Sequence, residues 1–137
     1  MTSSPEAAPA GSAGLFDDVA FDVFARRCAS RSALENITGR WGVLVLAALH
    51  DDTYRFNALR RRVDGVSEKM LAQTLHTLER DGFVVRTVQR QIPPRVEYSL
   101  TPLGRDTSAK LLELIGFLEH RMDEVVAARD GYDSARD

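Results

Sequence analysis

Residues 53–100 read TYRFNALRRRVDGVSEKMLAQTLHTLERDGFVVRTVQRQIPPRVEYSL, and this stretch decides the fold. It opens on the strand-like Tyr54-Arg55-Phe56 and continues with two amphipathic segments, Phe56 to Val63 and Ser67 to Asp81, which are separated by a turn at Asp64-Gly65-Val66-Ser67. Two strand-like runs at 83–90 and 95–100 follow, on either side of Ile92-Pro93-Pro94. The order helix, tight turn, helix, β-hairpin predicts a winged helix-turn-helix, a mainly α fold with a small β-hairpin wing (α+β). Such a unit presents its second helix to the DNA major groove.

The second amphipathic segment has two contrasting faces. Leu71, Leu75 and Leu78 recur at helical spacing and form an apolar stripe for the core. The opposite face carries polar and basic side chains, namely Lys69, Gln73, His76 and Arg80. Ser67 is a good N-cap, and Gly82 suits a left-handed position after the helix. In the preceding segment, apolar residues at positions 56, 59 and 63 leave Arg60, Arg61 and Arg62 facing outward.

Positive charge is concentrated in this part of the chain. Residues 55–95 hold nine basic and four acidic side chains, a net charge of +5, whereas the remainder carries −7. A basic centre with acidic flanks favours a face that binds a polyanion. Pro93 and Pro94 cannot supply ladder N–H groups, so we expect them at the hairpin tip, with Arg90 and Arg95 placed beside it for phosphate contacts.

The flanking regions predict a single domain with two tails. We expect a disordered tail over residues 1–14, a DNA-binding and dimerisation domain over 15–128, and a flexible tail over 129–137. Within the domain, Leu15 to Arg27 is expected to form a short helix, Ser30 or Ser32 to cap a second helix that Gly39 interrupts, and Trp41 to Leu49 to form the most buried helix.

A long helix is expected from Thr101-Pro102 to about Ala128, with Thr101 as N-cap and proline at the first helical position. Its apolar residues recur every four and three positions: Leu111, Ile115, Leu118, Met122 and Val125. This heptad-like seam predicts a dimerisation helix. The alternative is packing against the N-terminal helices of the same chain.

Composition narrows the function further. The chain of 137 residues is 44% hydrophobic and 28% charged, as is usual for a globular protein. It has no apolar run long enough to span a membrane and no signal-peptide pattern, so we expect a cytoplasmic protein without membrane contact. One cysteine and three scattered histidines make no metal spacing, and no phosphate loop, nucleophile elbow or carboxylate pair is present. We expect neither an enzyme nor a bound metal or cofactor.

Several motifs resemble those of a known family. They are Ile37-Thr38-Gly39-Arg40-Trp41, Tyr54-Arg55-Phe56-Asn57-Ala58-Leu59, Gly65-Val66-Ser67-Glu68-Lys69-Met70-Leu71, Leu78-Glu79-Arg80-Asp81-Gly82-Phe83-Val84 and the run from Pro93 to Gly104. In this order and spacing, the segment from Cys28 to Gly104 resembles the HxlR family of bacterial regulators, a MarR-like branch of the winged-helix proteins. The resemblance implies a homodimeric transcription regulator with helical dimer contacts from both ends of the chain and a recognition helix that starts near Ser67.

Members of that family usually carry a cysteine before the first core helix, often followed by proline. Cys28 occupies this place, but Ala29 follows it. Some members use the cysteine to sense electrophiles or oxidants, and the neighbouring Arg26, Arg27 and Arg31 would stabilise a thiolate. The alternative is a small apolar residue packed at the dimer interface.

Together these patterns predict a dimeric, sequence-specific DNA-binding regulator of a palindromic operator, responsive to a redox or electrophile signal or to a small-molecule effector. Base-reading residues are expected at Ser67, Lys69, Gln73 and Thr77. Contacts with the DNA backbone are expected from Arg55, Arg60, Arg61, Arg62, His76, Arg80, Arg90 and Arg95. The alternative function is a winged-helix protein–protein interaction module, which would need exposed apolar anchors and fewer charges on the same face.

Overall fold

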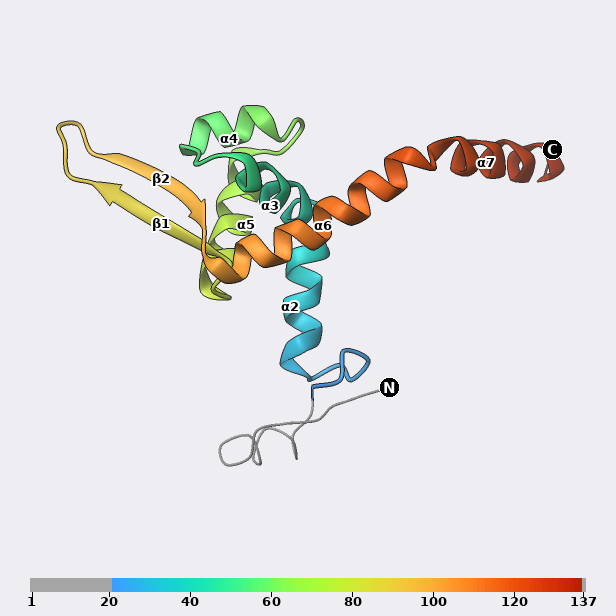
Figure 1. Cartoon of the computed structure of the whole chain (residues 1–137), viewed down its shortest axis with the longest axis horizontal. Coiled ribbons are helices and arrows are strands. Elements are labelled where there is room, and N and C mark those ends of the chain that lie inside the picture. The colour runs from blue at the N-terminus through green and yellow to red at the C-terminus, as the bar shows by residue number, and fades with distance from the viewer. Residues whose placement is uncertain (1–20, 137) are drawn as a thin grey trace. The chain divides into compact units, whose positions relative to one another are not determined.

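The computed structural model describes residues 21–136, and the chain divides after Glu35 into two compact units. The elements are α2 (Ala29–Thr38), α3 (Gly42–Asp51), α4 (Phe56–Arg62), α5 (Glu68–Arg80), β1 (Val84–Gln89), β2 (Arg95–Leu100), α6 (Pro102–His120) and α7 (Met122–Arg136). This mainly helical fold with one β-hairpin confirms the predicted winged helix-turn-helix (Figure 1).

Helix α3 supplies the centre of the core. Val45, Leu46 and Leu49 are at most 1% exposed, as expected for the most apolar helical segment of the sequence. The leucine stripe of α5 packs into the same cluster, together with Leu59 of α4. The predicted apolar faces of both amphipathic helices are therefore confirmed.

The turn between α4 and α5 and the end of α5 follow the predicted local chemistry. Ser67 Oγ accepts a hydrogen bond of 3.1 Å from the backbone N–H of Met70, so this serine caps α5. Gly65 and Gly82 have φ values of +92° and +85°, a region that favours glycine. These two glycines let the chain enter and leave the second helix sharply.

Strands β1 and β2 pair antiparallel from Val84 opposite Leu100 to Gln89 opposite Arg95, and Figure 1 shows the hairpin extending beyond α4 and α5. The expected strand at 54–56 is reduced to one bridge, Tyr54 with Tyr98. At the base of the hairpin, Thr101 Oγ1 donates to the Gly82 carbonyl at 2.6 Å and accepts from Gly104 N–H at 2.9 Å. One side chain thus joins the end of α5 to the start of α6.

The C-terminal region differs from the single long helix that the sequence predicted. The helix is interrupted at Arg121, so α6 and α7 are separate elements, and α7 continues to Arg136 instead of ending near Ala128. Leu111, the first residue of the predicted seam, is 7% exposed and belongs to the core of its own chain. Little of its surface is left for a second chain, and its role in dimerisation stays a prediction.

The N-terminal unit also departs from expectation. Residues 1–20 lie outside the described part, and with them the predicted tail and the start of the predicted helix from Leu15. Residues 21–28 form turns instead of the expected helix. Helix α2 begins at Ala29, so Ser30 and Ser32 lie inside it and neither caps it; Ser32 Oγ donates to the Ala29 carbonyl.

None of the helices between residues 21 and 136 is long and apolar enough to cross a membrane.

Candidate nucleic-acid interface

The solvent side of α5 carries the predicted polar face. Lys69, Gln73, His76 and Arg80 are all exposed, whereas the leucines on the other side are buried. Thr77 is half-buried. Ser67 is exposed, but its hydroxyl oxygen is engaged as the helix cap. The structure thus brings four predicted DNA-contacting residues onto one helical face.

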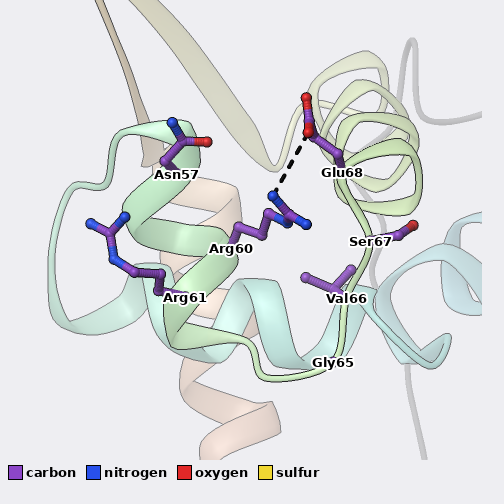
Figure 2. Close-up of a pocket in the computed structure, with 7 residues that line it drawn as sticks. All are labelled: Asn57, Arg60, Arg61, Gly65, Val66, Ser67 and Glu68. Carbon is purple, nitrogen blue, oxygen red and sulfur yellow. Dashed lines mark ion pairs between the residues drawn. The ribbon is translucent and has the colours of Figure 1, made fainter.

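A depression of about 720 Å³ opens between α4 and the start of α5 (Figure 2). Its lining consists of Asn57, Arg60, Arg61, Gly65, Val66, Ser67 and Glu68. Arg60 and Glu68 form an ion pair across it, with 3.7 Å between Nη1 and Oε2. Sequence reasoning assigned Arg60 to DNA and overlooked Glu68, because a carboxylate is not an expected side chain on a surface that meets phosphates.

A second depression of about 460 Å³ lies between α4 and the wing. It is lined by Arg55, Phe56, Asn57, Ala58, Arg61, Pro94 and Val96. Asn57 and Arg61 line both depressions, which places them on the ridge between the two. Asn57 was not among the predicted site residues, although its spacing of four from Arg61 puts both on one face of α4.

The wing places its two predicted arginines differently. Arg90 is exposed next to the tip formed by residues 91–94. Arg95 is half-buried, and its Nε atom is buried without a hydrogen-bond partner. Arg90 is therefore freely available to a phosphate, whereas the guanidinium of Arg95 is held partly within the protein.

A hydrogen bond connects the C-terminal end of α5 with the segment before α3. Asn36 Nδ2 donates to Asp81 Oδ2 over 2.9 Å, and Asp81 is the residue that ends α5. Asn36 is the first residue of the second compact unit. This side-chain contact fixes the far end of the predicted recognition helix, and no local sequence pattern indicated it.

Cys28 lies in the N-terminal unit, half-buried, just before α2. Its Sγ lies 3.2 Å from Ser30 Oγ and accepts a hydrogen bond of 3.2 Å from the backbone N–H of Asp22. The hydrogen bond with Ser30, followed by that with the backbone at Asp22, lowers the pKa of the Cys28 thiol. From the sequence, nearby arginines were expected to stabilise the thiolate. In the structure, the Arg31 side chain instead bonds with Glu35 and with the Phe24 carbonyl.

No group of three or more histidine, cysteine or acidic side chains within residues 21–136 is arranged to hold a metal ion.

Comparison with known proteins places this arrangement in a family. Residues 36–126 match the HxlR-like helix-turn-helix family. The chain belongs to this family. The match begins at Asn36 and spans the helix-turn-helix, the wing, α6 and the start of α7. The HxlR-like chain is thus a transcriptional regulator of the helix-turn-helix type, and the family implies DNA as its partner.

Individual relatives agree with this assignment. The HTH-type transcriptional regulator YtfH of Escherichia coli strain K12 is 52% identical over 109 residues, which are 80% of this chain and 86% of YtfH. The solved structure of ytfH from Salmonella typhimurium, described as a transcriptional regulator, covers 81% of this chain and 99% of that one, with 50% identity and a TM-score of 0.75. The redox regulator HypR in its reduced form shares 35% identity with a TM-score of 0.66, covering 72% and 97% of the two chains. All three relatives are described as regulators.

Proposed function

We propose that this HxlR-like protein is a dimeric, sequence-specific DNA-binding regulator that inserts α5 into the major groove. The observation that carries the proposal is the contrast between the two sides of α5. Three leucines anchor one side in the core, and Lys69, Gln73, His76 and Arg80 lie exposed on the other. A recognition helix needs both: a rigid attachment and side chains that reach base edges and phosphates.

Chemistry assigns a role to each exposed group. Lys69 and Gln73 lie in the first half of α5, which approaches the bases, and both side-chain types bond base edges. Ser67 and Thr77 are the remaining base-reading candidates at the start and the far half of the helix. His76 and Arg80 on α5, Arg55 before α4, Arg60 to Arg62 on α4, and Arg90 and Arg95 in the wing are assigned to the phosphates.

Dimerisation would rest on the apolar residues that α6 and α7 leave uncovered. Of the predicted seam, Leu118 is exposed, whereas Ile115, Met122 and Val125 are half-buried. Leu114 and Phe117, which the seam did not include, are more exposed than Leu118. A second copy that covered these side chains would remove apolar surface from water and bring two recognition helices onto one duplex.

Selection of binding sites from random duplexes tests the function directly. We expect a palindromic motif with half-sites about one helical turn apart, roughly 34–36 Å or a multiple of it. Failure to enrich any motif would contradict sequence-specific binding. It would favour the alternative, a winged-helix module that binds another protein, although the charged face of α5 lacks the apolar anchors of such a surface.

We further propose that Cys28 makes DNA binding responsive to oxidants or electrophiles. Support comes from its lowered pKa, since the thiolate is the nucleophilic form. The alternative is a packing residue without a sensing role. DNA affinity of the wild type and of Cys28→Ser, with and without diamide, separates the two. A response in the wild type alone supports sensing, and equal responses contradict it.

The pH dependence of the thiol gives an independent check. Because the hydrogen bond from Ser30 stabilises the thiolate, alkylation of Cys28 by iodoacetamide should rise at a lower pH in the wild type than in Ser30→Ala. Identical pH profiles would show that this hydrogen bond does not set the reactivity.

A further inference from the structure

The depression between α4 and α5 contains one charge that opposes DNA binding. Glu68 lines it together with Asn57, Arg60, Arg61 and Ser67, and Figure 2 shows the Glu68 and Arg60 side chains facing each other across the opening. The Glu68 side chain is 74% exposed and that of Arg60 46%. An ion pair this exposed contributes little to the stability of the fold. The larger consequence of the Arg60–Glu68 pair is therefore expected for DNA binding.

The other polar side chains around this opening are all suited to a phosphate. Two guanidinium groups, an amide and a hydroxyl are the groups that usually contact the DNA backbone. A carboxylate and a phosphate present similar charged oxygens to arginine. Glu68 thus offers Arg60 the same kind of partner that a backbone phosphate would offer.

We propose that Glu68 is an internal competitor for a DNA backbone phosphate: it pairs with Arg60 in the free protein and lowers the affinity for DNA of every sequence. The inference rests on the proposed function in assuming that this face meets DNA. For a phosphate to reach Arg60, the pair with Glu68 must open. Glu68 thereby weakens the sequence-independent part of binding, so base contacts supply a larger share of the whole.

The mechanism has a signature in salt dependence. An arginine that joins a phosphate releases condensed counterions from DNA, and each such contact adds about 0.9 to the slope of log K against log salt. While Arg60 stays paired with Glu68 in the wild type, it neutralises no phosphate and adds nothing to this slope. With the carboxylate removed, Arg60 should contribute to the slope in full.

The test measures duplex affinity of Glu68→Gln, by fluorescence anisotropy, on a random-sequence duplex and on any selected motif. We expect both affinities to rise alike, by about fivefold, the factor that corresponds to the upper range for an exposed pair. The slope against log salt should steepen by about one unit. Glu79→Gln is the matched control, because it makes the same charge change on α5 and Glu79 forms no ion pair within residues 21–136. Its effect should be clearly smaller.

A double-variant cycle with Arg60→Ala shows whether Glu68 acts through that arginine. The gain from Glu68→Gln should largely vanish once Arg60 is absent. Glu68 is also the first residue of α5, where a negative charge interacts favourably with the helix dipole. Its replacement can therefore lower stability, so melting temperatures are recorded for each variant. Loss of stability would weaken binding, so tighter binding cannot arise from it.

Three results would overturn the inference: a gain no larger than that of Glu79→Gln, a gain that persists in Arg60→Ala, or a change confined to one base pair of a motif. The last would make Glu68 a base-reading residue. Because the random duplex suffices, the absence of any selected motif would contradict the proposed sequence specificity while leaving this measurement decisive.

Discussion

Gly104, at the start of α6, lies against the backbone of Phe83, the residue that precedes β1. A Cβ atom there would be 1.9 Å from the carbonyl oxygen of Phe83, a distance that only backbone movement could relieve. We expect Gly104→Ala to lower the free energy of unfolding by about 1–3 kcal/mol, as overpacking does elsewhere. Urea denaturation measures this change.

Gly116 provides the control for that substitution, since it lies in the same helix with no atom within 4 Å of a built Cβ. Gly116→Ala should stabilise the protein by about 0.5–1 kcal/mol, because alanine loses less backbone entropy in a helix. Similar effects of the two substitutions would show that the contact at Phe83 does not constrain Gly104.

At single residues, the sequence predicted which side of a helix a side chain occupies better than it predicted the partner that the side chain bonds with. Helical spacing was enough to place Gln73 on the exposed side of α5 and Leu75 in the core. It could not foresee that Glu68 pairs with Arg60, or that Ser30 rather than an arginine lowers the pKa of Cys28. Periodicity specifies direction from the helix axis, whereas a partner depends on side-chain conformations and on neighbouring elements.

Among the elements, the helix-turn-helix and wing were predictable because their ends carry local signals. Ser67, Gly82 and the Thr101-Pro102 pair mark boundaries that the structure confirms. The break at Arg121 has no such signal, since no glycine or proline lies there and the apolar spacing continues across it. Arg121 ends α6 with its N–H bonded to the Leu118 carbonyl, and its side chain pairs with Glu124 of α7.

Helix α5 and the wing should contribute to DNA binding in different ways. Gln73→Ala should relax discrimination at one base position by about 1–3 kcal/mol if Gln73 forms a bidentate contact. Arg90→Ala should weaken binding to all duplexes alike and flatten the salt slope by about one unit. Selection experiments and salt titrations measure the two effects. An altered motif from Arg90→Ala, with none from Gln73→Ala, would transfer base reading to the wing.

For the molecule as a whole, the exposed apolar surface of α6 is the feature that the single chain leaves unexplained. Leu114 and Phe117 are each 58% exposed, and Leu118 is 48% exposed. They lie three and one positions apart, so all three fall on one side of the helix. Of the predicted seam, Leu118 lies on this surface, whereas Leu111 packs in the core of its own chain.

A second copy of the chain is the expected cover for this surface. Phe117→Glu should shift the protein from dimer to monomer at micromolar concentration, because a buried unpaired charge opposes association. Sedimentation velocity measures the shift.

Leu103→Glu is the control: it adds the same charge at an exposed leucine of α6, 14 positions before Phe117, and should leave the dimer intact. Since one recognition helix then binds without its partner, Phe117→Glu should also reduce affinity for a two-half-site duplex much more than for a single half-site. A dimer that survives Phe117→Glu would place the interface elsewhere on the chain.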